Sequence, residues 1–264
     1  MSDLKVEKIG HVVVIAIDRP EKRNAFTLEI VEEIVNHLAA LKQDDGCRAV
    51  VLTGRGGAFC SGVDLSVIED MQASGQAAPA DWKHLLTEKV HRIALALEDF
   101  DKPTIAAVDG AAYGAGMDLA LMCDMRFVST KARFCEAYIN LGVVPGDGGC
   151  YYLPRIVGVP KALELLLSGR VVDAEEAREI GLANRVCAPD ALMEETLSFA
   201  AGLATKSPAA IRLIKRATYQ SLGTSLQASL DLISSHMALI QSMEDTQEAA
   251  RALRDGDDPE FTGR

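Results

Sequence analysis

The 264-residue sequence lacks a basic excess, a long uncharged apolar run and an apolar leader. Lys and Arg total 27 against 38 Asp and Glu, so the formal net charge is −11. Nucleic acids and anionic membranes attract cationic surfaces, so this charge argues against both as main partners. No apolar run approaches the roughly 20 residues that a membrane helix needs. The opening MSDLKVEKIG has no apolar core of a secretory signal, and a cytoplasmic location is expected.

Spacings typical of metal, redox and nucleotide sites are also missing. None of the six cysteines forms a CxxC pair, and buried free thiols in a reducing cytosol are the simplest interpretation. None of the five histidines has HxxxH spacing, so packing roles are expected and no metal is predicted. The chain contains neither GxGxxG nor GxxxxGK[ST], which argues against dinucleotide and P-loop sites.

What the sequence does contain is an alternation of β-branched runs with helical periods. The expected strands are His11–Asp18, Arg48–Thr53, Pro103–Val108, Met125–Val128 and Arg185–Cys187. Helical periods at Thr27–Leu41 and Leu85–Leu97 separate the first three strands. This order predicts an α/β fold with a largely parallel sheet. The end of the chain has only helical patterns, so we expect a core over residues 1–200 and a helical oligomerisation part over residues 201–264.

Two glycine-rich turns are the main candidates for chemistry. GGAFCSGVDL occupies residues 56–65 and DGAAYGAGMDL occupies residues 109–119, each after an expected strand. Small residues let a ligand approach the backbone closely. Two such turns that face each other can present main-chain N–H groups to an oxygen that gains negative charge, as an oxyanion hole requires. The alternative is that both turns are purely structural.

The residues around these turns resemble the crotonase (enoyl-CoA hydratase/isomerase) family across nearly the whole chain. The matching segments are RPEKRNAF (19–26), VVLTGRGGAFCSGVDL (50–65), KPTIAAVDGAAYGAGMDLALMCDMRF (102–127), LGVVPGDGGCYYLPRIVG (141–158) and GRVVDAEEAREIGLANRV (169–186). The resemblance implies a ClpP-like spiral of ββα repeats whose helical C-terminal part mediates homotrimers or dimers of trimers. It also implies an acyl-CoA thioester as substrate, with coenzyme A entering as part of that substrate and no separate cofactor.

The resemblance assigns roles to both turns. Ser61 and Ala115 stand where the family places its two oxyanion-hole N–H groups. The segments that match the coenzyme A site supply the following predicted binding residues: Arg23, Ala25, Phe26, Gly62, Val63 and Asp64. Arg23 and Lys22 are candidate cations for the phosphates, and a solvated turn is the alternative.

The acid–base residues depart from the family pattern. Asp118 replaces the first glutamate of the hydratase pattern, and a capping acid is its alternative role. Tyr138 stands in place of the second glutamate, where it is expected to shape the acyl pocket rather than to donate a hydrogen bond. Glu136, two residues upstream, is a catalytic candidate, and a structural or salt-bridging role is its alternative. Asp147 is the other candidate; some isomerases and dehalogenases of the family carry their acid at the position of Gly146, and helix capping is the alternative for Asp147.

The expected function is acyl-CoA processing through an oxyanion-hole-stabilised thioester enolate, as in hydration or double-bond isomerisation. The altered acid–base set leaves a non-catalytic acyl-CoA-binding protein as one alternative. A hydrolase on the same scaffold is another.

Overall fold

A computed structural model describes residues 3–73, 75 and 78–264. Its main sheet has the strand order β1-β2-β3-β4-β6-β9, and only β1 runs antiparallel to its neighbour. These strands are β1 (Leu4–Ile9), β2 (Val12–Ile17), β3 (Ala49–Gly54), β4 (Thr104–Val108), β6 (Met125–Ser129) and β9 (Arg185–Cys187). A small second sheet has the order β5-β7-β8 and consists of β5 (Ala111–Tyr113), β7 (Arg133–Cys135) and β8 (Val172–Asp173).

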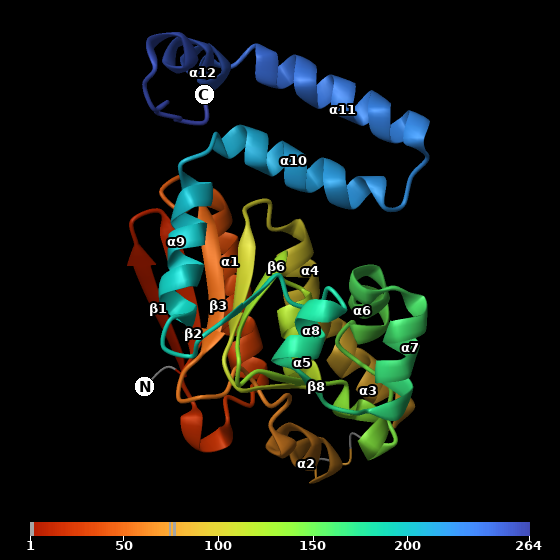
Figure 1. Ribbon diagram of the computed structural model, residues 1–264. Helices are drawn as coiled ribbons and strands as arrows, with labels where there is room; N and C mark the ends of the chain where they lie inside the picture. The colour runs from red at the N-terminus through yellow and green to blue at the C-terminus, as the bar shows by residue number, and fades with distance from the viewer. Residues whose placement is uncertain (1–2, 74, 76–77) are drawn as a thin grey trace.

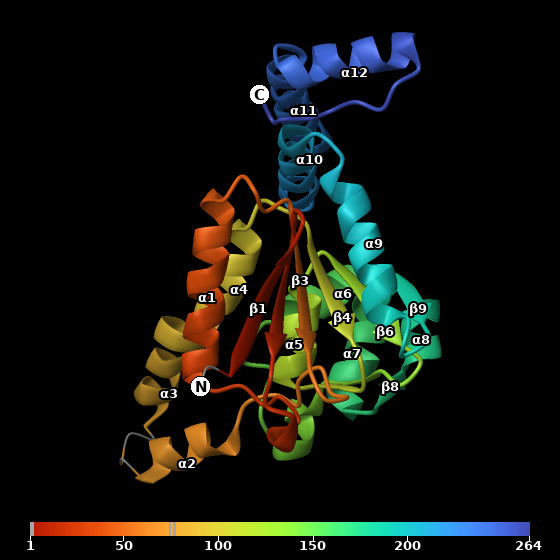
Figure 2. The same ribbon diagram turned by 90° about the vertical axis from the view of Figure 1, so that its left-hand side faces the viewer.

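Helices cover both faces of the main sheet, as Figure 2 shows with the sheet nearly edge-on. Alternate residues of β2 and β3 pack on opposite sides, because successive side chains of a strand point to opposite faces. Val13 and Val50 belong to the core on the side of α1 (Leu28–Gln43). Val12 and Val51 belong to the core on the side of α9 (Leu192–Ala204). Burial on both faces explains why these strands are continuous β-branched runs.

Of the remaining helices, α4 (His91–Asp99) lies beside α1 (Figure 2), while α2 (Leu65–Ala73) and α3 (Pro79–Leu85) lie at the lower end of the molecule in Figure 1. The others before residue 200 are η1 (Pro20–Lys22), η2 (Leu86–Val90), α5 (Ala115–Leu121), η3 (Ala137–Leu141), α6 (Gly149–Val157), α7 (Val159–Ser168) and α8 (Ala174–Glu179). The helices α10 (Pro208–Ser221), α11 (Leu226–Gln241) and α12 (Glu244–Asp255) stand apart from the sheet, at the end opposite α2 and α3.

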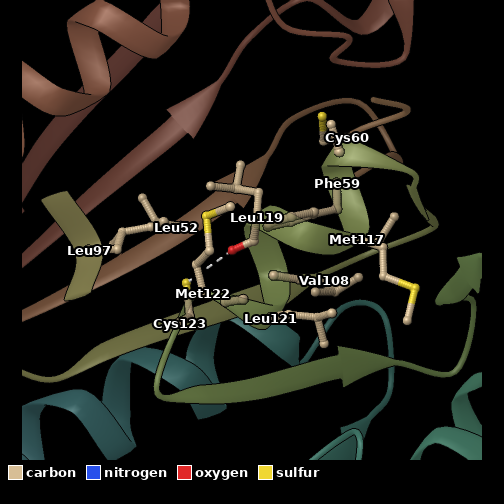
Figure 3. Packing of buried hydrophobic residues seen from close by; sticks show 14 of the residues in the cluster. Leu52, Phe59, Cys60, Leu97, Val108, Met117, Leu119, Leu121, Met122 and Cys123 are labelled. Atoms are coloured by element: carbon tan, nitrogen blue, oxygen red, sulfur yellow. Dashed lines mark hydrogen bonds between the residues drawn. The ribbon is translucent and has the colours of Figure 1, made fainter. Parts of the chain in front are cut away.

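Helix α5 runs through the centre of the core, with all seven of its residues buried. Met117 and Leu119 pack among the apolar side chains drawn in Figure 3, which also include Leu52, Phe59 and Val108. Close packing fixes a helix in place, so any side chain on α5 has a defined position. One of these side chains is Asp118, which is fully buried.

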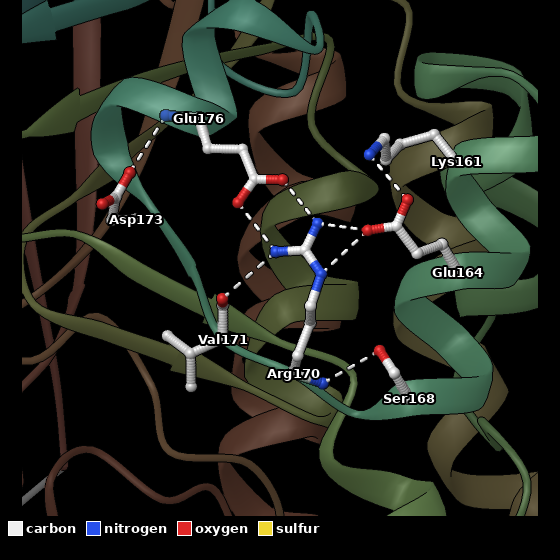
Figure 4. A network of polar contacts seen from close by, with 7 residues as sticks. All are labelled: Lys161, Glu164, Ser168, Arg170, Val171, Asp173 and Glu176. Atoms are coloured by element: carbon white, nitrogen blue, oxygen red, sulfur yellow. Dashed lines mark hydrogen bonds and ion pairs between the residues drawn. The ribbon is translucent and has the colours of Figure 1, made fainter.

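An ionic network fixes the segment around Arg170, between α7 and α8. The Arg170 guanidinium pairs with Glu164 on α7 and with Glu176 on α8 (Figure 4). The preceding residue, Gly169, accepts hydrogen bonds through its carbonyl from Cys135 Sγ at 3.2 Å and from Asn140 Nδ2 at 3.2 Å. The network therefore supports β7 and η3, the elements on either side of Glu136.

The five strands predicted from the sequence are confirmed, while β1 and the second sheet were not anticipated. Only the first residue of β1 is buried, so its apolar residues do not mark a core face. The strands β5, β7 and β8 have two or three residues each, which is too short for a periodic pattern. The division at residue 200 stays a prediction. None of the described helices is long and apolar enough to cross a membrane.

Candidate active site

The two glycine-rich turns lie against each other beside the start of α5. Cys60 N–H donates to Ala111 O at 3.0 Å, and Tyr113 N–H donates to Cys60 O at 3.0 Å. Gly116 completes the contact, because a Cβ on this residue would fall 2.1 Å from Cys60 O. A glycine is therefore required where α5 meets the first turn.

The Ser61 amide is not available to a ligand, and the prediction of Ser61 as an oxyanion-hole residue is wrong. Its N–H donates to Arg23 O at 3.1 Å. The neighbouring bonds, from Phe26 N–H to Gly62 O and from Asp64 N–H to Phe26 O, form a parallel bridge centred on Val63. The N–H at the centre of such a bridge points away from its partner strand, since backbone groups alternate in direction along a strand. Val63 N–H therefore faces away from Phe26.

The amides of Val63 and Ala115 have no backbone acceptor among the described residues. Ala115 is the first residue of α5, where the N–H groups have no intrahelical partner. The backbone next to Val63 faces this helix start, because a Cβ on Gly62 would lie 3.0 Å from Tyr113 O and 3.7 Å from Ala115 N. Two unpaired N–H groups from separate turns thus lie close together, and Val63 takes the place predicted for Ser61.

The predicted coenzyme A segments are joined to each other through the same bridge. Arg23 and Asn24 both have positive φ angles, 50° and 58°, which residues other than glycine rarely adopt. Buried Asn24 holds this turn, donating through Nδ2 to Arg55 O at 2.7 Å and to Ala58 O at 2.6 Å. The Asp64 carboxylate is anchored by Arg19 and by the Ser66 N–H, and its own N–H and carbonyl are bonded to Phe26 O and to Val67 N–H, so Asp64 holds the turn together.

Three carboxyl groups and one phenol meet beyond the amide pair. The Tyr138 hydroxyl lies 2.7 Å from Asp118 Oδ2 and 2.5 Å from Asp147 Oδ2. The Tyr138 ring lies 3.9 Å from the Cβ position of Gly114, the residue before Ala115. A hydroxyl has a single proton, so Tyr138 donates to one carboxylate while the other shares that proton or donates its own. Asp118, Tyr138 and Asp147 form a continuous proton path.

These contacts decide between the alternatives that the sequence left open. The Asp118 carboxyl group accepts a hydrogen bond from Tyr138 and does not cap α5. The N-cap of α5 is Gly114, and no side chain makes a capping hydrogen bond there. Asp147 does not cap α6, since the N-cap there is Gly148, again without a side-chain bond. Tyr138 binds both acids, so the expectation that it only shapes a pocket is wrong. His91 was expected to pack, and its Nε2 lies 2.8 Å from Gly146 O, which holds the loop that carries Asp147.

Glu136 joins the group from the end of β7. It is 1% exposed, and it forms no ion pair with any described residue, so the salt-bridging role is wrong. A Cβ on Gly149 would lie 2.6 Å from Asp118 Oδ1 and 2.9 Å from Glu136 Oε1. The two carboxyl groups are therefore side by side, and the residue facing them must lack a side chain.

Burial raises the pKa of every acid in the group, and repulsion by a neighbouring carboxylate adds to the rise at Asp118 and Glu136. The pKa of Asp118 rises to about 7, first through burial and then through the charge of Asp147. The pKa of Glu136 rises to about 9, through burial and then through the charge of Asp118. Burial also raises the pKa values of Asp147 and Tyr138. Carboxyl groups that hold protons near neutral pH are typical of acid–base sites.

Comparisons with known proteins identify the family. The family model described as enoyl-CoA hydratase/isomerase matches residues 7–264. The chain belongs to the enoyl-CoA hydratase/isomerase family. A 2,3-dehydroadipyl-CoA hydratase of Escherichia coli is 34% identical over 264 residues, covering all of both chains. A crotonyl-CoA hydratase of Syntrophomonas wolfei is 32% identical and covers 94% of this chain and 93% of its own. A crystal structure of an enoyl-CoA hydratase from Bacillus anthracis superposes with a TM-score of 0.92 at 29% identity, covering 100% of both chains.

Membership in the enoyl-CoA hydratase/isomerase family confirms the predicted crotonase fold and makes the chain an acyl-CoA-processing enzyme of hydratase/isomerase type. The member described here carries an Asp–Tyr–Asp path and a third buried acid. Within the described residues, no group of three or more His, Cys, Asp or Glu has an arrangement that could hold a metal ion.

Proposed function

We propose that the enzyme transfers protons at the α-carbon of an enoyl-CoA thioester, through an enolate whose oxygen binds the amides of Val63 and Ala115. The two unpaired N–H groups beside a buried carboxyl carry this proposal. Pre-oriented N–H donors stabilise an oxyanion strongly in a site that excludes water. Polarisation by main-chain amides needs no separate cofactor, and coenzyme A enters with the substrate.

Asp118 is the primary acid–base group in this mechanism. When it takes a proton from the α-carbon, the C–H electron pair moves toward the thioester carbonyl, and the oxygen charge is held by the two N–H groups. In hydration water adds to the β-carbon, a carboxylate takes the water proton, and the resulting 3-hydroxyacyl enolate, held by the same two N–H groups, receives a proton at its α-carbon from a protonated acid of the group. Tyr138 and Asp147 exchange the proton with Asp118 along their hydrogen bonds.

Double-bond isomerisation is the reaction that the Asp118–Tyr138–Asp147 path favours over hydration. A proton accepted at one end of the path can be returned to a different carbon without release to water. Hydration requires in addition that a carboxylate activates water, and burial keeps Asp118 partly protonated near neutral pH. The phenol connects the two acids, so the tyrosine at this position is compatible with turnover and the non-catalytic alternative is not needed.

Tyr138→Phe is expected to lower turnover of 2-enoyl- and 3-enoyl-CoA thioesters by about 10²-fold, because it removes a positioned proton donor. Proton NMR in ²H₂O separates a 3-hydroxyacyl product from a migrated double bond, and a thiol assay detects free coenzyme A from hydrolysis. Tyr151→Phe is the matched control, since Tyr151 is exposed and contacts Arg155 and Tyr152. Wild-type rates in Tyr138→Phe would contradict the mechanism, as would binding of every thioester without turnover.

We also propose that the enzyme is a homotrimer or a dimer of trimers. Exposed apolar side chains on or next to α10 and α11 support this, among them Ile214, Leu222, Leu226, Leu230 and Met237. Contiguous exposed apolar surface commonly marks an interface. Sedimentation equilibrium is expected to give the mass of three or six chains, and Leu226→Glu with Leu230→Glu is expected to lower it. A monomeric wild-type protein would refute the assembly.

A further inference from the structure

Glu136 is the one acid of the site that the proton path above does not use. Both of its carboxyl oxygens are buried and have no hydrogen-bond donor among the described residues. A buried carboxylate without a donor is strongly destabilising. A carboxylate can only accept hydrogen bonds, whereas a protonated carboxyl group can donate one. A neutral Glu136 could therefore bond to a neighbouring acceptor.

The group beside Glu136 is the free oxygen of Asp118. Tyr138 occupies Asp118 Oδ2, while Asp118 Oδ1 has no donor among the described residues. Asp118 Oδ1 and both Glu136 oxygens lie 2.6, 2.9 and 3.0 Å from the same point, the Cβ position of Gly149. Two facing acceptors repel each other unless a proton lies between them, as in paired catalytic carboxyl groups.

We infer that Glu136 is a positioning residue: as a neutral carboxylic acid it donates its proton to Asp118 Oδ1 and orients that carboxylate for proton transfer. Asp118 then has a donor on each oxygen, Glu136 on Oδ1 and Tyr138 on Oδ2. This role rests on the proposed function of Asp118 and adds a second, independent control over its ionisation. Glu136 itself does not contact the substrate in this arrangement.

The ionisable groups around Glu136 all favour its neutral form. Asp118 on α5 and Asp147 before α6 repel a charge on it, and Cys135 on β7 and Cys150 on α6 are its other ionisable neighbours. No cation pairs with it among the residues that the structure describes. Burial and these charges raise the pKa of Glu136 to about 9, so the donor is lost as the pH rises through that value.

The test compares pH profiles of kcat in wild type, Glu136→Gln and Glu136→Leu. Wild-type kcat is expected to fall above about pH 9. Glutamine keeps an N–H donor that does not titrate, so Glu136→Gln is expected to be active without this alkaline limb. Leucine removes the donor, so Glu136→Leu is expected to lose roughly 10- to 100-fold in kcat with little change in KM, as for loss of a hydrogen bond to a charged group.

A measurement without turnover separates this inference from the proposed function. The infrared difference between wild type and Glu136→Gln at pH 7 is expected to contain the carbonyl stretch of a protonated carboxyl group. Exposed Glu175 provides the control, since Glu175→Gln should change only a carboxylate band. Thermal stability of the wild type should also fall more steeply than that of Glu136→Gln as the pH rises from about 5 to 9, because only a native state that binds the extra proton loses stability there.

Three results decide the matter. Absence of the protonated-carboxyl band, or an alkaline limb that persists in Glu136→Gln, would overturn the role of Glu136. If the wild type turns over no enoyl-CoA but the band is present, the proposed function fails while the protonation of Glu136 stands. A band together with a removed alkaline limb supports both.

Discussion

Asp118→Asn is expected to lower turnover of enoyl-CoA thioesters by about 10²–10⁴-fold, the usual contribution of a general acid–base group. Asparagine keeps the shape of the side chain and can still accept the Tyr138 hydrogen bond at 2.7 Å. It removes the charge that repels Asp147 and Glu136, so the thermal stability of the variant is expected to match or exceed that of the wild type. Loss of activity without loss of stability would distinguish a chemical role from a structural one.

The pH dependence of the same reaction is expected to report the ionisation of Asp118. A base must be ionised, and the pKa of Asp118 is raised to about 7. The rate of proton abstraction should therefore increase as the pH rises through 7. Below that value the protonated carboxyl cannot accept the α-proton, and this acid limb should be absent from the residual activity of Asp118→Asn.

Asp124→Asn is the matched control, because Asp124 follows α5 but takes no part in the site. Its carboxylate pairs with Lys215 at 2.7 Å and accepts hydrogen bonds from Thr104 and Tyr219. Its replacement should reduce stability while the folded protein keeps its turnover. If Asp118→Asn instead retained wild-type rates, or if both variants lost activity in proportion to stability, Asp118 would have no catalytic role.

The fold was largely predictable because its sheet is buried on both faces. Continuous β-branched runs such as His11–Asp18 are characteristic of such strands, and β2 lies within that run. The edge strand β1 escaped prediction because its residues after Leu4 are exposed. The second sheet escaped because pairs such as β7 with β8 involve two or three residues and depend on contacts distant in sequence.

The sequence located the segments that form the site, but it did not predict the hydrogen bonds between their residues. The motif located the turn at residues 61–64, yet which amide is free depends on the bridge between Phe26 and Val63, which is a long-range contact. That register commits Ser61 N–H to Arg23 and releases Val63 N–H. The nearby Arg23–Phe26 segment was the available signal, since two short segments that are predicted to line one ligand can also form hydrogen bonds with each other.

The proton-transfer groups illustrate the same limit. Asp147 and Tyr138 are nine residues apart, and the chain between them turns at Gly142, which ends η3 with a φ of 71°. Glu136 reaches Asp118 because it lies at the end of β7, before η3 begins. Periodicity alone does not determine the conformation of residues 134–142, a short segment that ends with a glycine.

Substitution of the Val63 amide by an ester tests the central claim most directly, because it removes one N–H and leaves the side chain intact. The ester is made by incorporating the α-hydroxy analogue of valine, and the matched control is the corresponding ester at Ser61, whose N–H is bonded to Arg23. Loss of one oxyanion donor should reduce kcat by about 10²–10³-fold at Val63. The Ser61 ester should lose some stability and keep its turnover. A Val63 ester with wild-type kcat, or a larger loss of kcat at Ser61 than at Val63, would contradict the account.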